Sequence, residues 1–187
     1  SNILRWWLRT TRRLLILGVS ITNLPQAQAF SPSDVELQLA DMTRSHSAQG
    51  RPEMIYDPML SLAARAKARD MGVRNYAAHI DPDGYGANKA SQLAGYRLPE
   101  WWPNELNSNF IESLAFGYGS AQKAFDAWLG SSAHLPHVLG QTDFYQGQTR
   151  YGFGYAEVSG STYTRYYVFL SAPPSRHPVA NLEPYTE

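Results

Sequence analysis

The stretch RYGFGYAEVSGSTYTRYYVFLSA, residues 150–172, decides the fold class of this chain. Its two halves, 150–158 and 163–172, are rich in aromatic and β-branched residues, and the tripeptide SGS lies between them. Two such runs joined by a short polar turn predict a β-hairpin. Gly152 and Gly154 alternate with aromatic residues in the first run, which favours close packing against a neighbouring element. The end of the chain is therefore expected to form an antiparallel sheet.

Helical signals fill the chain before this hairpin. Ser33 and Glu36 have the spacing of a capping box at the start of one helix. Asp57 followed by Pro58 is a typical start for a second helix, and Gly72 is a typical end. Early helices followed by paired strands indicate an α+β domain with a largely antiparallel sheet. The remaining predicted elements are a third helix within 87–96, a strand within 110–119 and a fourth helix within 121–130.

Charge and cysteine content narrow the class of protein. The 187 residues carry 16 basic and 16 acidic side chains and no cysteine, so core packing alone must hold the domain together. Residues 1–29 combine four arginines, an apolar run and an A-x-A sequence, which is the pattern of a secretory signal peptide. The other 158 residues carry 12 basic and 16 acidic side chains, a net charge of −4, which argues against a nucleic-acid partner. We expect a secreted protein, extracellular or periplasmic, that touches a membrane only through an uncleaved signal segment.

Four side chains are candidates for chemistry. His134 and His137 lie three residues apart and could share a helix face if the helix continues past Pro136. Glu112 lies in an apolar run, where a carboxylate either points to solvent or is paired or ligating. His79 follows the end of a predicted helix, where a lone histidine is more often structural than a ligand. Two histidines alone do not define a zinc site, because such sites use at least three protein ligands.

Five segments along the chain have a characteristic order and spacing. They are LSLAARAKARDM (60–71), HIDPDGYGANKASQLAGY (79–96), FIESLAFGYGSAQKAFDAWLGSSAHLPHVLG (110–140), YGFGYA (151–156) and YYVFLSA (166–172). In this order they resemble the CAP domain, which is shared by cysteine-rich secretory proteins, antigen 5 and plant pathogenesis-related proteins. The likeness is to the cysteine-free, bacterial secreted branch of the family and covers roughly residues 34–173.

The resemblance implies an α–β–α sandwich over residues 30–172, between a signal peptide at 1–29 and an irregular tail at 173–187. It also implies a cleft with two histidines and acidic side chains, which in eukaryotic relatives can hold a divalent cation, usually zinc. The matching positions, and hence the implied metal ligands, are His79, His134 and Glu112.

This sequence departs from the family pattern at two places. The Gly-Glu-Asn segment of the family reads IES here, at 111–113. The acidic residue expected shortly after Trp128 is absent, and Ser131 lies near that place. His137 is an additional imidazole that could take over part of its role.

The leading functional hypothesis is an extracellular binding module whose cleft is able to hold a divalent metal. Its ligand would be a small molecule, a lipid or a glycan, contacted by aromatic side chains of the Pro- and Asn-rich segment 97–109, where Trp101 and Trp102 are expected to be exposed. The expected cleft residues are His79, Glu112, His134 and His137.

Two other interpretations stay open. One is a zinc-dependent, peptidase-like hydrolase that uses the same cleft, although the sequence identifies neither a general base nor a substrate pocket for it. In the other, the polar groups of the cleft are purely structural and form a hydrogen-bond network that joins the sheet to the helices.

Overall fold

A computed structural model describes residues 30–103 and 105–175 of the chain. The predicted signal peptide and residues 176–187 of the predicted tail lie outside the described residues, so these two assignments stay predictions. No helix in the described ranges has the length and apolar character needed to cross a membrane.

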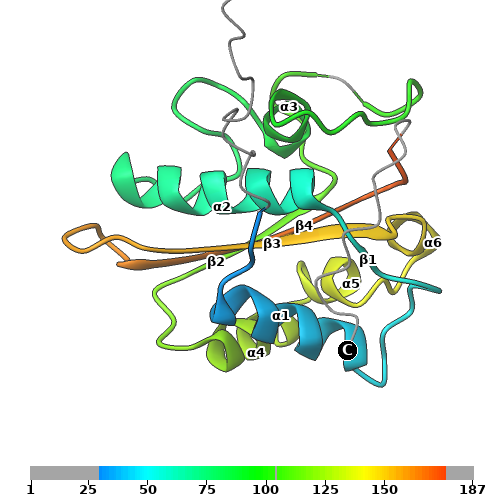
Figure 1. The fold of residues 1–187 in the computed structure, drawn as a ribbon, viewed down its shortest axis with the longest axis horizontal. Helices are drawn as coiled ribbons and strands as arrows, with labels where there is room; N and C mark the ends of the chain where they lie inside the picture. Colours follow the sequence, from blue (N-terminus) through cyan, green and yellow to red (C-terminus); the bar gives the residue numbers. More distant parts are fainter. Residues whose placement is uncertain (1–29, 104, 176–187) are drawn as a thin grey trace, which may run out of the picture.

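The described residues form a four-stranded sheet in the order β1-β3-β4-β2, which lies at the centre of the fold (Figure 1). β3 and β4 form the predicted hairpin, with Phe153 opposite Phe169. β2 pairs antiparallel with the other side of β4, whereas β1 runs parallel to β3, so the sheet is largely antiparallel as expected. The strands are β1 Ile55–Tyr56, β2 Glu112–Phe116, β3 Arg150–Glu157 and β4 Arg165–Ala172.

The helices begin at the residues that the capping signals mark. The Ser33 hydroxyl accepts a hydrogen bond from the backbone N–H of Glu36, whose carboxylate accepts one from the backbone N–H of Ser33. At the second helix, Oδ1 of Asp57 accepts hydrogen bonds from the backbone N–H groups of Met59 and Leu60, at 2.8 and 3.0 Å. The helices are α1 Asp34–Ser45, α2 Pro58–Val73, α3 Ala87–Leu93, α4 Ala121–Leu129, α5 Leu135–Val138 and α6 Asp143–Gln146.

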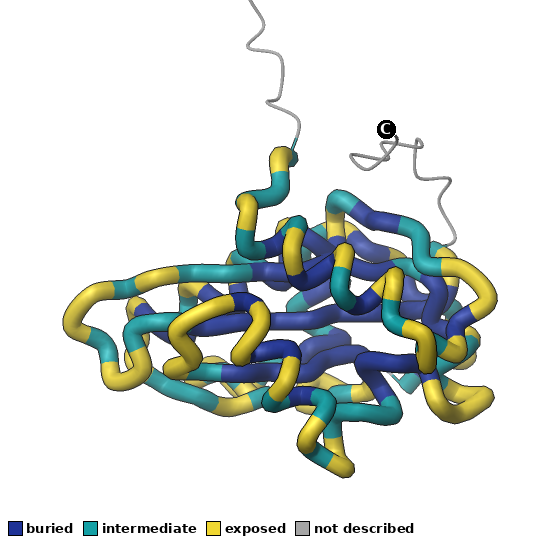
Figure 2. The backbone as a smooth tube through the Cα atoms, turned by 90° about the horizontal axis from the view of Figure 1, so that it is seen from below, coloured by how far each residue is buried: buried dark blue, intermediate teal, exposed yellow. Residues whose placement is uncertain are grey.

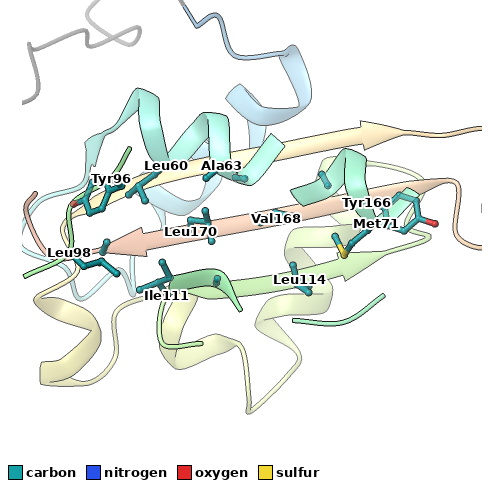
Figure 3. Packing of buried hydrophobic residues seen from close by; sticks show 14 of the residues in the cluster. Leu60, Ala63, Met71, Tyr96, Leu98, Ile111, Leu114, Tyr166, Val168 and Leu170 are labelled. Atoms are coloured by element: carbon teal, nitrogen blue, oxygen red, sulfur yellow. The ribbon is translucent and has the colours of Figure 1, made fainter. Parts of the chain in front are cut away.

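The elements form three layers, as the α–β–α prediction requires. α2 and α3 cover one face of the sheet, and α1, α4 and α5 cover the other (Figure 1). Figure 3 shows the first of two hydrophobic cores, in which Leu60 and Met71 of α2 pack with Val168 and Leu170 of β4. The second core lies on the opposite face and includes Trp128. The central strands are mostly buried, and the loops at both ends of the sheet are largely exposed (Figure 2).

Two glycines of β3 allow α2 to lie directly on the sheet. A Cβ atom at Gly154 would lie 2.1 Å from the backbone carbon of Ala64, and one at Gly152 would lie 2.3 Å from the backbone nitrogen of Ser61. These contacts are with backbone atoms, which cannot move aside as a flexible side chain can. The close packing predicted from the alternation of glycine with aromatic residues is therefore present.

A buried carboxylate ties α1 to both of its neighbours. Glu36 is 1% exposed, and besides capping α1 it accepts a hydrogen bond from the backbone N–H of Tyr155 on β3, at 3.0 Å. It also forms an ion pair with Arg65 of α2, and this pairing raises the pKa of Arg65. Since a buried charge must be paired to be tolerated, Glu36 fixes the position of α1 relative to α2 and β3.

Three local details differ from the sequence-based expectation. α2 continues through Gly72 to Val73, and Gly72 serves packing instead, because a Cβ there would lie 2.4 Å from Cγ2 of Val158. The helix that carries His137 is a single short turn. The short elements β1 and α6 had no counterpart among the predicted elements.

Candidate functional site

His79 and Glu112 form a close pair at one end of the sheet. His79 lies in the loop after α2, and Glu112 is the first residue of β2. Nδ1 of His79 lies 2.8 Å from Oε1 of Glu112, whose side chain is 1% exposed while that of His79 is 42% exposed. An ionised carboxylate can only accept hydrogen bonds, so in a neutral ring that pairs with it Nδ1 carries the hydrogen and Nε2 keeps its lone pair. The buried carboxylate thus fixes the orientation of a solvent-accessible imidazole.

Two further side chains hold this pair in place. Oδ1 of Asn109 accepts a hydrogen bond from the backbone N–H of Glu112 at 3.0 Å. Its amide nitrogen lies 3.0 Å from Nδ1 of His79, which is a packing contact and not a hydrogen bond while Nδ1–H donates to Glu112. Nζ of Lys67 donates to the backbone carbonyl of His79 at 3.0 Å and to the hydroxyl of Tyr76 at 3.2 Å. Burial lowers the pKa of Lys67. Both the ring and the backbone of His79 are therefore constrained.

His134 lies immediately before α5. Its Nδ1 lies 2.8 Å from Oγ of Ser131. Burial and, second, the charge of His79 lower the pKa of His134, so the two imidazoles lie in the same region of the fold. Neither Nε2 atom has a hydrogen-bond partner within the described part of the chain. Two half-exposed imidazoles, each oriented through Nδ1, therefore leave their Nε2 atoms for a ligand.

The predicted set of three zinc ligands does not fit this geometry. The carboxylate of Glu112 is almost fully buried and pairs with Nδ1 of His79. It therefore orients a neighbouring imidazole and does not face an ion. Among the residues that the structure describes, no group of three or more His, Asp or Glu side chains is arranged to hold a metal ion. His79 and His134 remain as donors, which is one ligand short of a catalytic zinc site.

His137 does not lie in the cleft, in contrast to the prediction. Its side chain is buried, with Nδ1 2.7 Å from Oγ of Ser113 on β2 and Nε2 2.8 Å from Oγ of Ser171 on β4. Burial and, second, the charge of Arg51 lower the pKa of His137 well below 6.5. Across the single turn of α5, the ring of His134 contacts Ser131 and that of His137 contacts the sheet, so the two histidines do not share a face.

Trp101 and Trp102 have opposite environments, although the sequence predicts both to be exposed. Trp101 is 73% exposed and Trp102 only 4%. The ring of Trp102 stacks on Phe144 with a centroid distance of 5.3 Å and meets Phe110 edge-on at 6.4 Å. Trp101 in turn packs edge-on against Trp102 at 5.3 Å. Trp102 is therefore the buried centre of an aromatic cluster rather than a ligand contact.

We refer to Trp101, Trp102, Phe110 and Phe144 as the aromatic patch. Phe110 and Phe144 are 41% and 45% exposed, and sequence reasoning missed both. Phe110 is the first residue of the predicted strand segment, and Phe144 comes from a segment with no helical or strand periodicity, so only the folded chain brings them together. The patch adjoins the imidazoles, because Phe110 follows directly after Asn109, which contacts His79.

The two surface grooves found in the described residues lie elsewhere. One, of about 470 Å³, lies between α2 and the outer end of β3 and includes Arg69 and Tyr155. The other, of about 440 Å³, lies between α2 and α3 and includes Leu62, Leu93 and Lys67. Lys67 also bonds the backbone of His79, but neither groove is lined by the paired imidazoles or the aromatic patch.

Comparisons with known proteins agree with this architecture. No family model matches the chain. The uncharacterized protein YkwD of Bacillus subtilis is 28% identical over 155 residues, which cover 79% of this chain and 52% of YkwD, so the chain spans about half the length of that curated relative. An extracellular protein containing an SCP domain from Bacillus anthracis matches with a TM-score of 0.56 and 20% identity, over 75% of this chain and 40% of that protein. An outer surface protein from Borrelia burgdorferi matches with a TM-score of 0.56 and 15% identity, over 76% of this chain and 93% of the other.

Proposed function

We propose that this chain, which has the CAP/SCP-like fold, acts outside the cell as a binding module. Its binding surface would comprise the aromatic patch and the two half-exposed imidazoles of His79 and His134. An extracellular location is supported by the basic and apolar pattern of residues 1–29 and by the descriptions of the two structural neighbours as extracellular and outer-surface proteins.

The exposure of aromatic rings beside polar groups carries this proposal. An indole that is 73% exposed, next to phenyl rings that are 41% and 45% exposed, leaves apolar area in water that a stable domain would otherwise bury. These rings are also fixed, because Trp102 packs against all three of them. A rigid aromatic surface loses little conformational entropy on binding, which favours ligand contact.

The chemistry of the surface suits a ligand with both apolar and hydrogen-bonding groups. The aromatic patch offers ring faces and edges for acyl chains or for the C–H faces of sugars. Nε2 of His79 can accept a hydrogen bond from a hydroxyl group while its ring is neutral, and Nε2 of His134 can accept or donate one according to its tautomer. A lipid head group or a glycan has this combination of properties.

A tryptophan fluorescence titration tests the proposal. The probes are vesicles of phosphatidylcholine and phosphatidylglycerol and, separately, soluble cell-wall glycan fragments, each with and without a chelator. We expect one probe to shift the emission of the wild-type protein, and Trp101→Ala to weaken its binding by about tenfold, because an exposed aromatic anchor contributes roughly 1–2 kcal/mol. Trp102 still reports on binding in that variant.

Leu62→Ala is the matched control, since Leu62 is 51% exposed but lies on α2. It should bind the probe as the wild-type protein does. The proposal fails if neither class of probe changes the emission, or if Trp101→Ala and Leu62→Ala bind equally well.

The described site gives no support to the zinc-dependent hydrolase. Glu112 is committed to His79, and the nearest hydroxyl to His134, that of Ser131, contacts Nδ1 rather than the free Nε2. We propose that a divalent cation binds only weakly at the two imidazoles, and we therefore expect probe binding to persist in the presence of chelator.

A further inference from the structure

Arg51 is a buried cation that is held by carbonyl groups instead of a carboxylate. It is 5% exposed, and no Asp or Glu of the described residues lies within ion-pair distance of it. Nε donates to the carbonyl of Gln148 at 2.8 Å and Nη1 to that of Val138 at 3.0 Å, while Nη2 donates to the carbonyl of His137. Burial lowers its pKa to about 10, so the guanidinium is charged at neutral pH.

The same guanidinium is part of a hydrogen-bond network that leaves no member unpaired. The hydroxyl of Ser171 donates to Oε1 of Gln148 at 2.7 Å, so its lone pairs are free to accept from Nη2 of Arg51 and from Nε2 of His137. Nε2 of His137 must therefore carry the hydrogen, and Nδ1 accepts from the hydroxyl of Ser113. The network links the loop after α1, two strands of the sheet and α5.

This network fastens residues 131–148 to the sheet. We refer to these residues as the α5–α6 segment. The loop that precedes Arg51 adds a hydrogen bond from the backbone N–H of Gly50 to the carbonyl of Leu139, at 2.8 Å. Gly140, with a φ of +58°, lets the chain turn beneath the arginine, because a Cβ there would lie 2.7 Å from Cγ of Arg51. His134 is linked to α5 by a hydrogen bond that its backbone carbonyl accepts from the backbone N–H of Val138, at 2.9 Å.

The α5–α6 segment carries His134 and Phe144, which belong to the two halves of the candidate site. Besides these hydrogen bonds, Val138 and Leu139 pack in the second core, while α5 and α6 themselves are single turns of four residues each. Because isolated turns are unstable, their geometry depends on contacts with the rest of the fold. Arg51 provides three of these contacts to backbone carbonyls, and no shorter or non-planar side chain could make all three at once.

We propose that Arg51 is the positioning residue of the site, which sets the α5–α6 segment and thereby places His134 beside His79 and Phe144 against Trp102. This role goes beyond the proposed binding function and does not depend on the identity of any ligand. It predicts that loss of the guanidinium loosens this segment selectively.

Hydrogen exchange measured by mass spectrometry on the full chain tests the proposal. In Arg51→Met, amides of residues 135–148 should exchange at least about tenfold faster than in the wild-type protein, since several hydrogen bonds to a charged group are lost. The exchange rates of amides in α2 and in the β3–β4 hairpin should change only by the amount that the change in global stability accounts for.

Met71→Ala separates a positioning role from a merely structural one. Met71 is fully buried in the first core, which contains no residue of the α5–α6 segment, so its truncation lowers global stability without touching that segment directly. Arg51→Lys keeps the charge but not the planar fork, and should give a smaller, equally localised effect if Arg51→Met does not fold. The proposal is overturned if the arginine variants quicken exchange uniformly, as Met71→Ala should, or leave the exchange of residues 135–148 unchanged.

Discussion

Three histidines of this chain differ in what surrounds them rather than in their local sequence. His79 and His134 keep half-exposed rings, each oriented through Nδ1, whereas His137 is buried between two serines and an arginine. The sequence could select His79 and His134 through resemblance to a known family. It could not exclude His137, because its partners Ser113 and Ser171 lie 24 and 34 residues away along the chain.

The burial of His137 makes the stability of the protein depend on pH. Its folded-state pKa lies well below the ordinary 6.5, so below pH 6.5 the unfolded chain takes up a proton that the folded chain does not. The free energy of unfolding should therefore be constant above about pH 7 and fall by up to about 1.4 kcal/mol per pH unit as pH decreases from about 6.5. His134 adds a smaller contribution of the same sign, since its pKa is also lowered.

Urea unfolding at a series of pH values measures this dependence. His137→Gln removes the titrating group, so its free energy of unfolding should be lower at neutral pH and should fall less steeply below pH 6.5. A variant whose pH slope equals that of the wild-type protein would show that other groups cause the acid sensitivity.

Local sequence signals predicted the helices that have a capping residue at their start and the strands with an alternating residue pattern. The capping box of α1, the Asp-Pro start of α2 and the aromatic hairpin are all present. β1 could not be predicted in this way, since its two residues are a strand only because β3 lies beside them. α6 did carry a signal, a Thr142 hydroxyl that accepts the backbone N–H of Tyr145, but one turn has no periodicity to support it.

The close approach of α2 to β3 predicts which glycine is essential. Gly154→Ala should lower the free energy of unfolding by about 2 kcal/mol or more, because the added methyl group meets the backbone of Ala64 and must displace α2. Gly119→Ala is the control, since no atom lies within 4 Å of a Cβ at that position. Its effect should stay within about 0.5 kcal/mol. Equal stability of the two variants in urea unfolding would mean that α2 does not rest on the backbone of β3.

At the scale of the whole molecule, the layered fold collects the site from distant segments. The loop after α2, the start of β2, and the α5–α6 segment meet at one end of the sheet, where they bring together His79, Glu112, His134 and the aromatic patch. The order of five sequence segments was enough to predict this architecture. The aromatic patch could not be predicted, because which tryptophan is buried depends on Phe110 and Phe144 packing around it.

The central claim is that the aromatic patch and the imidazoles contact the same ligand. Isothermal titration calorimetry of the probe that binds in the fluorescence experiment, with wild-type protein, Trp101→Ala, His134→Ala and Leu62→Ala, tests it most directly. Both Trp101→Ala and His134→Ala should weaken binding of that probe at least about fivefold, and Leu62→Ala should leave it unchanged. Wild-type affinity in either of the first two variants would show that the patch and the imidazoles do not form one binding surface.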